Sequence, residues 1–216
     1  MKFKAVLFDL DGTLLDTLQD IADSTNQALC LLGFPQHEPE AYRIFIGDGR
    51  EALAMRALPE QHRDKAMVSR AVARINEEYS RRWADHTQPY QGIPDLLDDL
   101  TGHNVKMAVL SNKAHQLTEM MVSQMLARWH FDCVVGASPA LPNKPEPTAA
   151  LQIAQRLDIQ PAEFIYLGDS DVDMRTATRA GMYPVGALWG FRSLDELMTG
   201  GAKQVIEHPS DLLQLL

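Results

Sequence analysis

The sequence has few of the features that mark secreted, membrane-spanning or disulfide-stabilised proteins. Only 2 of its 216 residues are cysteines. Cys30 and Cys133 lack metal-ligand spacing, which fits two reduced core residues in a reducing compartment. No apolar run reaches the roughly 18 residues of a transmembrane helix, and acidic residues follow the amino terminus too early for a secretory signal. We therefore expect a soluble, cytoplasmic protein without a membrane partner.

Basic residues are also scarce. Lys and Arg number 20 against 29 Asp and Glu, so the formal net charge is −9. General nucleic-acid binding is therefore disfavoured, because a phosphate backbone is held largely by Lys and Arg. The charge still permits a small anionic substrate, provided that a metal ion and a few local cations neutralise it. The sequence contains no His/Cys cluster and no His-Glu-x-x-His motif, which disfavours zinc as that metal.

The apolar pattern divides the chain into three segments. The run Ala5–Phe8 predicts a buried strand that ends in an acidic turn. Residues 16–85 show helical spacing, and from residue 86 onward strands and helices alternate, which is typical of a parallel sheet. The first strand can find partners only after residue 90. We therefore predict an α/β core of residues 1–15 and 86–216, with a Rossmann-like parallel sheet, interrupted by a helical insert of residues 16–85.

Polar side chains follow three of the predicted strands, and a lysine lies in the loop after a fourth. Asp9 and Asp11 follow the first strand, Ser111 follows a second and Asp169 a third. Lys144 lies in a proline-rich loop. Because the carboxyl ends of parallel strands meet at one edge of a sheet, we expect these side chains to converge there.

The residue types at this edge suit phosphate chemistry assisted by a metal ion. The carboxylates of Asp9, Asp169 and Asp173 favour a hard cation bound through oxygen, and Mg²⁺ is the natural choice. Lys144 supplies a point charge and the Ser111 hydroxyl a short hydrogen-bond donor. These are the groups expected around a phosphate.

The same residues suit a reaction in which a carboxylate attacks a phosphate dianion. The two are repelled by about 8 kcal/mol at about 4 Å and an effective dielectric constant of about 20. A divalent metal together with Lys144 can offset this repulsion. Asp11, two residues after Asp9, can then act as general acid for the leaving alkoxide and as general base for the hydrolytic water.

Four motifs occur in the order found in one family of hydrolases. They are DLDGT at residues 9–13, Ser111-Asn112, Lys144-Pro145 and GDSDVD at residues 168–173. Together they resemble the haloacid dehalogenase superfamily of phosphohydrolases. The resemblance implies that Asp9 is a nucleophile forming an aspartyl-phosphate and that Asp11 is the acid/base. The implied substrate-binding residues are Thr13, Ser111, Asn112 and Lys144, and the implied magnesium ligands are Asp9, Asp169 and the Asp11 backbone carbonyl, with Asp173 supporting the metal through its waters.

Finer features resemble the phosphoglycolate phosphatase branch of that superfamily. They are KPEP at residues 144–147, the motif from Gly168 to Met174, and Trp189-Gly190-Phe191-Arg192. The helical insert would then be a cap whose turn, Gly47-Asp48-Gly49-Arg50, faces the active site, with Arg50 contacting the substrate. The resemblance implies a small phosphorylated metabolite similar to 2-phosphoglycolate, acted on by a monomer or homodimer.

Three alternatives remain at this point. A phosphomutase of the same superfamily would share every core residue and differ in its cap. A haloacid dehalogenase is set aside, because its relatives lack an acid at the position of Asp11. A non-catalytic binding module on the same fold is disfavoured by the intact set of Asp9, Asp11, Ser111, Lys144 and Asp169, since a protein without catalytic duty need not retain all five.

Overall fold

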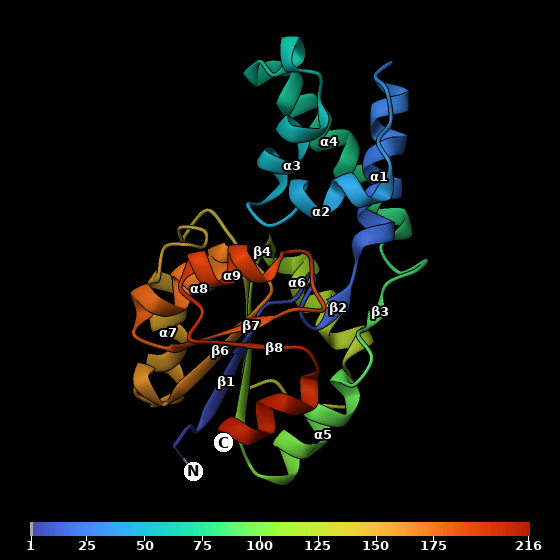
Figure 1. Ribbon diagram of the computed structural model, residues 1–216. Coiled ribbons are helices and arrows are strands. Elements are labelled where there is room, and N and C mark those ends of the chain that lie inside the picture. The colour runs from blue at the N-terminus through green and yellow to red at the C-terminus, as the bar shows by residue number, and fades with distance from the viewer. Residues whose placement is uncertain (1) are drawn as a thin grey trace. The chain divides into compact units, whose positions relative to one another are not determined.

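The computed structural model describes residues 2–216, which form two compact units (Figure 1). The first, called the core unit below, comprises residues 2–15 and 89–216 of the described chain, and the second, called the helical unit, comprises residues 16–88. Among the described residues, no helix combines the length and apolar character needed to cross a membrane.

The core unit is built on a six-stranded parallel sheet with the strand order β5-β4-β1-β6-β7-β8. Its central strands, β1 and β6, are buried along their whole length, as their unbroken apolar sequences AVLF and FIYLG require. The strands are β1 (Ala5–Phe8), β4 (Lys106–Ala114), β5 (Cys133–Ala137), β6 (Phe164–Gly168), β7 (Tyr183–Ala187) and β8 (Gln204–Ile206). The sheet confirms the predicted α/β class.

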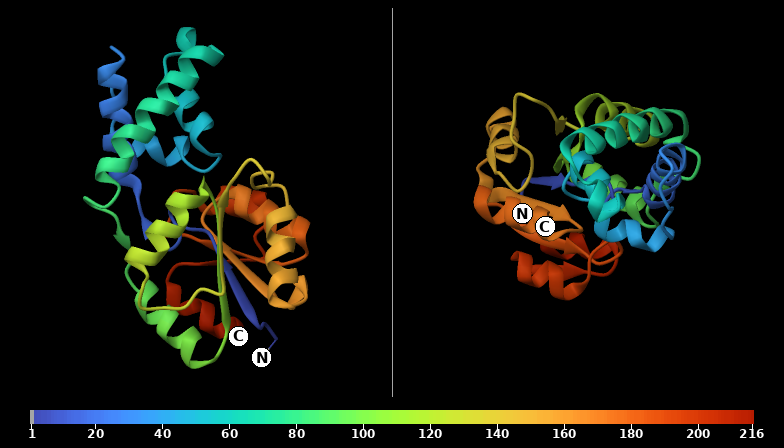
Figure 2. Two further views of the ribbon diagram at one scale, coloured as in Figure 1. Left: turned by 180° about the vertical axis from the view of Figure 1, so that it is seen from behind. Right: turned by 90° about the horizontal axis from the view of Figure 1, so that it is seen from above.

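Helices cover both faces of this sheet. In the left view of Figure 2, α5 and α6 lie on one side of it and α7 and α8 on the other. Side chains of α7 and α8 pack on alternate residues of the central strands, Ala5 and Leu7 of β1 with Phe164 and Tyr166 of β6. The elements are α5 (Ile93–Gly102), α6 (His115–Met125), α7 (Thr148–Leu157), η3 (Pro161–Glu163), α8 (Asp171–Ala180), α9 (Leu194–Gly200) and η4 (Pro209–Leu215).

Two core elements differ from the sequence pattern. The apolar run predicts a strand that ends at Leu110, before Ser111, but β4 continues to Ala114 because its pairing with β5 shifts register between Leu110 and Ala114. Ser111 therefore lies within an irregular strand end and not after it. The end of the sequence predicts a terminal helix, and the structure forms it as a 3₁₀-helix, η4, which begins with Pro209.

The helical unit is held together mainly by α1 packing on α4. Asp20 of α1 also accepts hydrogen bonds from the backbone N–H of His86 (3.0 Å) and from the backbone N–H and hydroxyl of Thr87 (2.9 and 2.7 Å). The helices are α1 (Leu18–Leu31), η1 (Pro39–Ala41), α2 (Tyr42–Phe45), α3 (Arg50–Ala57), η2 (Glu60–His62) and α4 (Lys65–Arg82). The two connecting segments, β2 (Leu15–Asp16) and β3 (Gln88–Pro89), form a two-stranded sheet that the sequence pattern does not predict.

Candidate active site

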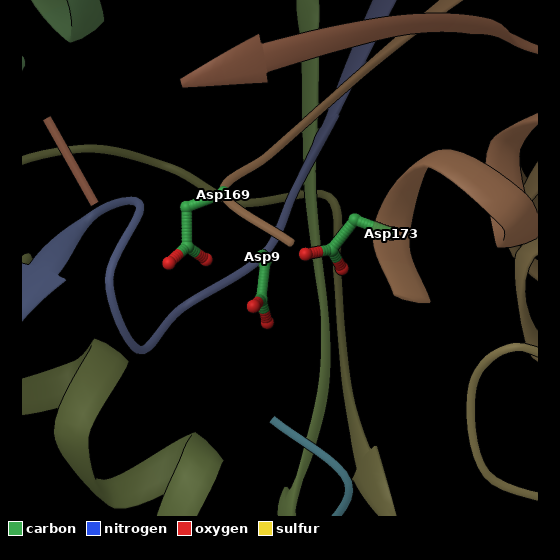
Figure 3. Close-up of side chains that lie close together, drawn as sticks. All are labelled: Asp9, Asp169 and Asp173. Atoms are coloured by element: carbon green, nitrogen blue, oxygen red, sulfur yellow. The ribbon is translucent and has the colours of Figure 1, made fainter. Parts of the chain in front are cut away.

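Three carboxylates meet at the carboxyl edge of the sheet. Asp9 follows β1, Asp169 follows β6, and Asp173 lies in the first turn of α8. One oxygen of each lies within 4.8 Å of the others, and all three residues are buried (Figure 3). Strands β1 and β6 are neighbours in the sheet, so their parallel pairing brings together two residues that are 160 positions apart by number (169 − 9).

The ammonium group of Lys144 lies between two of these carboxylates. Its Nζ is 2.8 Å from Asp9 Oδ1 and 2.6 Å from Asp173 Oδ1, and its side chain is buried. Burial alone would lower the pKa of Lys144, but the negative charges of Asp173 and Asp9 outweigh it and raise that pKa well above its usual value. The lysine is therefore expected to be charged at neutral pH.

The carboxylate of Asp173 is fully occupied by hydrogen-bond donors of the protein. Its Oδ1 accepts from Lys144 and from the Tyr166 hydroxyl (3.3 Å), and its Oδ2 accepts from the backbone N–H and hydroxyl of Ser170 (3.1 and 2.6 Å). Ser170 and Asp173 also form the capping box that begins α8. Asp173 thus holds Lys144 in place while fixing the start of the helix.

Asp169 is held on both oxygens as well. Its Oδ1 accepts from the Thr13 hydroxyl (3.3 Å) and its Oδ2 from the backbone N–H of Phe191 (2.8 Å). Burial, followed by the charge of Asp173, raises the pKa of Asp169 to about 7, although the Phe191 N–H opposes the shift. The turn after β1 approaches this carboxylate so closely that a Cβ atom on Gly12 would collide with it.

Asp9 is the least satisfied of the three. Burial and then the charge of Asp173 raise its pKa well above the usual value. Its Oδ1 contacts Lys144, yet that buried oxygen accepts no hydrogen bond of normal geometry from residues 2–216. Three carboxylates around one lysine leave an excess of negative charge, and a buried oxygen without a donor is a suitable ligand atom. The residues therefore fit a divalent cation bound through oxygen.

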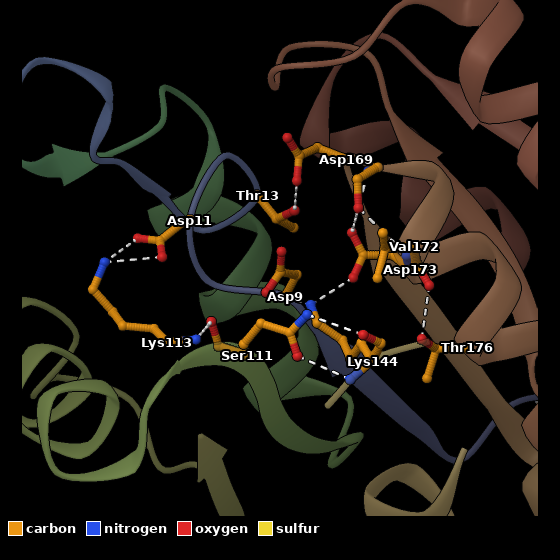
Figure 4. A network of polar contacts seen from close by, with 12 residues as sticks. Asp9, Asp11, Thr13, Ser111, Lys113, Lys144, Asp169, Val172, Asp173 and Thr176 are labelled. Carbon is orange, nitrogen blue, oxygen red and sulfur yellow. Dashed lines mark hydrogen bonds and ion pairs between the residues drawn. The ribbon is translucent and has the colours of Figure 1, made fainter. Parts of the chain in front are cut away.

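Asp11 does not belong to this cluster. Its carboxylate turns toward Lys113, whose Nζ lies 2.7 and 2.9 Å from the two carboxylate oxygens (Figure 4). Lys113 lies near the end of β4, the strand beside β1, and its side chain is only 7% exposed. We did not predict a role for Lys113, although it directly follows the Ser111-Asn112 motif and is a cation at the same sheet edge.

Of the other expected phosphate-binding residues, Asn112 contacts Lys144 directly. Asn112 pairs through its side-chain amide with the backbone of Lys144. The Ser111 hydroxyl accepts from the backbone N–H of Lys113 at 3.2 Å and is buried. Contact of Ser111, Asn112 and Thr13 with a substrate stays a prediction. The contacts of Tyr166 and of the Phe191 N–H were not predicted either. Phe191 lies in the motif Trp189-Gly190-Phe191-Arg192, but no motif marks Tyr166.

Arg50 belongs to the helical unit, where it is the first residue of α3. The turn before it is held by Arg56, which donates to the carbonyl oxygens of Ile44 (3.3 Å) and Phe45 (3.0 Å) and forms an ion pair with Asp48. The expected contact between Arg50 and a substrate stays a prediction.

Comparison with known proteins identifies similar sequences over almost the whole chain. Residues 6–187 match the family described as haloacid dehalogenase-like hydrolase. The chain is 32% identical over 213 residues to phosphoglycolate phosphatase of Aquifex aeolicus, covering 99% of this chain and 96% of the relative. It is also 32% identical over 216 residues to phosphoglycolate phosphatase of Chromobacterium violaceum, with the same coverage of 99% and 96%.

Solved structures agree with these sequence matches. A crystal structure from Lactobacillus delbrueckii subsp. bulgaricus, provisionally assigned as a phosphoglycolate phosphatase, superposes with a TM-score of 0.93 at 27% identity, covering 100% of this chain and 98% of the other. A haloacid dehalogenase-like hydrolase from Streptococcus pneumoniae superposes with a TM-score of 0.89 at 25% identity, covering 99% and 98%.

Proposed function

The chain belongs to the haloacid dehalogenase-like hydrolases, and from that premise we propose that it hydrolyses a small phosphate monoester similar to 2-phosphoglycolate through an aspartyl-phosphate on Asp9. The curated relatives at 32% identity are phosphatases, and this chain is a phosphatase with them. We further propose that its metal is Mg²⁺. We expect a cytoplasmic enzyme that acts as a monomer or homodimer.

The observation that carries the proposal is the position of Asp9 Oδ1. This oxygen is buried, lies 2.8 Å from the ammonium of Lys144, and accepts no hydrogen bond of normal geometry from residues 2–216. The other carboxylate with which Lys144 pairs, Asp173, has donors on both oxygens. Asp9 is therefore the carboxylate best suited to attack phosphorus.

The first step transfers the phosphoryl group to Asp9. A carboxylate oxygen of Asp9 forms a bond to phosphorus while the bond from phosphorus to the ester oxygen breaks. The proton that the leaving alkoxide needs comes from the carboxyl group of Asp11. Lys144, with its raised pKa, stays charged and stabilises the negative phosphoryl oxygens during transfer.

The second step returns the enzyme to its starting state. Asp11, now ionised, takes a proton from a water molecule that attacks phosphorus, and the bond between phosphorus and Asp9 breaks. Inorganic phosphate leaves, and both aspartates regain their original protonation states. A divalent cation held by Asp9, Asp169 and the Asp11 backbone carbonyl would neutralise part of the phosphoryl charge.

The helical unit is proposed to select the substrate. Arg50 begins α3 directly after the turn whose Asp48 pairs with Arg56, and its guanidinium is suited to a second anionic group such as a carboxylate. Closure of the helical unit over the bound ester would exclude bulk water from the phosphoryl intermediate.

The test is phosphate release from a panel of phosphorylated metabolites that includes 2-phosphoglycolate. Each compound is assayed with Mg²⁺, with excess chelator, and with Mg²⁺ restored. We expect metal-dependent release from one or two compounds. A phosphomutase would instead convert a sugar phosphate to its isomer without net release. If the folded protein releases phosphate from no compound in the panel and forms no isomer, a non-catalytic module is favoured.

A further inference from the structure

Lys113 is a buried cation whose side chain reaches across the sheet edge to the proposed acid/base. Its Nζ contacts both oxygens of Asp11, at 2.7 and 2.9 Å, and the side chains of the two residues are only 7% and 13% exposed. A charge removed from water in this way is held firmly by its counter-ion, because few water molecules compete for it. The pair is therefore unlike an exposed ion pair, whose partners exchange freely.

The carboxylate of Asp11 finds its cationic partner on a different strand from its own. It lies in the turn between β1 and β2, outside any ladder except a single bridge to Leu15, and the next residue, Gly12, has a φ of +86°. Backbone hydrogen bonds such as that from Gly12 N–H to the Leu15 carbonyl oxygen (2.9 Å) hold the turn, whereas Lys113 contacts the carboxylate itself. Lys113, by contrast, lies on the strand next to β1, and its backbone N–H is held by the Ser111 hydroxyl.

We propose that Lys113 is a positioning residue for Asp11, and that its ammonium sets the orientation from which the Asp11 carboxyl exchanges protons with the leaving group and with water. This inference rests on the acid/base role of Asp11 in the proposed function. It assigns Lys113 a different task from Lys144, whose ammonium lies against Asp9 and Asp173 and thus beside the phosphoryl group.

The effect of replacing Lys113 should depend on the leaving group. An alkoxide leaving from an alkyl phosphate must be protonated as the ester bond breaks, whereas nitrophenolate leaves without a proton. A residue that acts only through Asp11 therefore affects the transfer step with 2-phosphoglycolate much more than with p-nitrophenyl phosphate. A residue that holds the phosphoryl group affects both substrates alike.

The experiment measures this transfer step by single-turnover rapid quench with the full-length magnesium-loaded enzyme in excess over substrate. Under this condition, loss of substrate reports transfer to Asp9 alone. We expect Lys113→Met to slow transfer from 2-phosphoglycolate by about 10- to 100-fold, part of the 10²–10⁴-fold that general acid–base catalysis contributes. Transfer from p-nitrophenyl phosphate should change by less than about threefold, and Lys113→Arg should restore most of the loss.

Two controls isolate the role. Lys106→Met changes another lysine of β4 that also pairs with an aspartate, Asp132, but at the opposite end of the strand and exposed to solvent, and it should leave both rates unchanged. In an Asp11→Asn background, Lys113→Met should add no further loss, because the two residues act as one unit. The ratio of the transfer rates with 2-phosphoglycolate and p-nitrophenyl phosphate, measured on one preparation, does not depend on the folded fraction. If Lys113→Met does not fold, Lys113→Gln is measured in the same way.

The outcomes separate the two proposals. The inference would be wrong if Lys113→Met slowed transfer equally from both substrates, or slowed it further in the Asp11→Asn background. Either result would show that Lys113 binds the phosphoryl group itself. No loss in Lys113→Met would overturn it as well. An inactive wild-type enzyme, or an Asp11→Asn variant that slows both substrates equally, would instead contradict the proposed function.

Discussion

The side-chain amide of Asn112 pairs with both backbone groups of Lys144. Its Nδ2 donates to the Lys144 carbonyl oxygen at 3.2 Å, and its Oδ1 accepts from the Lys144 backbone N–H at 2.9 Å. Both residues are buried. The pairing joins the end of β4 to the loop that follows β5, so one amide places the backbone from which the Lys144 ammonium reaches Asp9.

Replacing Asn112 should therefore weaken phosphate binding without removing a charge. We expect Asn112→Ala to reduce the free energy of unfolding by about 1–3 kcal/mol, the cost of leaving buried backbone groups unpaired. We expect the inhibition constant of inorganic phosphate to rise about tenfold, or 1.4 kcal/mol. Asn143→Ala, at the exposed position just before Lys144, is the matched control. An unchanged inhibition constant in a destabilised Asn112→Ala protein would limit Asn112 to a role in folding.

Asp9 provides the most direct test of the covalent step. Asp9→Asn retains the shape of the side chain but removes the nucleophilic carboxylate, so turnover should fall by at least about 10³-fold, as expected for loss of a nucleophile. The protein should stay folded, because the substitution also removes a charge whose burial is unfavourable, as the raised pKa of Asp9 indicates. Phosphate release and thermal unfolding are measured on the same preparation. Residual activity near that of the wild type would contradict the aspartyl-phosphate mechanism.

Metal binding should depend on pH through Asp169. Its pKa in the metal-free protein is about 7, so below that pH the carboxyl group is mostly protonated and a cation must displace the proton. We therefore expect the affinity for Mg²⁺ to fall as pH falls, by about tenfold between pH 8 and pH 6, with proton release on binding at pH 6. Calorimetric titration in two buffers of different ionisation enthalpy measures both quantities. An affinity that does not vary over this range would exclude protonated Asp169 as the form that competes with the metal.

Arg50 is expected to recognise the part of the substrate that is not phosphate. Arg50→Ala should raise the KM for carboxylate-bearing esters such as 2-phosphoglycolate by about 10-fold or more, the usual loss for a charge-assisted hydrogen bond of about 1.5–3 kcal/mol. The KM of an uncharged alkyl phosphate should change little. Arg43→Ala, at an exposed arginine of the same unit that pairs with Glu40, is the control. An equal effect on both esters, or none, would remove Arg50 from the specificity site.

The sequence alone predicts those parts of the fold and site that follow from a local apolar pattern together with the topology of a parallel sheet. The apolar runs of β1 and β6 predict buried parallel strands, and that topology predicts that Asp9 and Asp169 meet at one edge, where the structure indeed places them. It was insufficient where a side chain's partner depends on tertiary packing. The register shift that carries β4 on to Ala114 is a property of its pairing with β5, and no local rule indicates that Lys113 turns toward Asp11.

The same limit applies to Asp173. Its place in the motif predicts a role beside the metal, which stays a prediction, and the motif does not indicate that its oxygens accept from Lys144, Tyr166 and Ser170. The hydroxyl of Tyr166 comes from the middle of a buried strand, where an aromatic residue in the sequence indicates only core packing. Only the folded structure shows that this hydroxyl also donates a hydrogen bond to Asp173.

Gly12 offers a test of how closely the turn after β1 must approach Asp169. Gly12 and Gly33 both have positive φ angles, +86° and +79°, but a Cβ atom on Gly33 would meet nothing within 4 Å, whereas one on Gly12 would collide with the Asp169 carboxylate. Gly33→Ala should therefore lower the free energy of unfolding by only about 1–2 kcal/mol, the cost of a residue with a Cβ atom in the left-handed region. Gly12→Ala should lower the free energy of unfolding by about 1–3 kcal/mol more, because the added methyl group is overpacked against Asp169. Displacement of Asp169 should also weaken Mg²⁺ binding. Urea unfolding and magnesium titration of the two variants measure the difference. Equal destabilisation, with unaltered Mg²⁺ affinity in Gly12→Ala, would show that the turn can move away from Asp169 without consequence for the site.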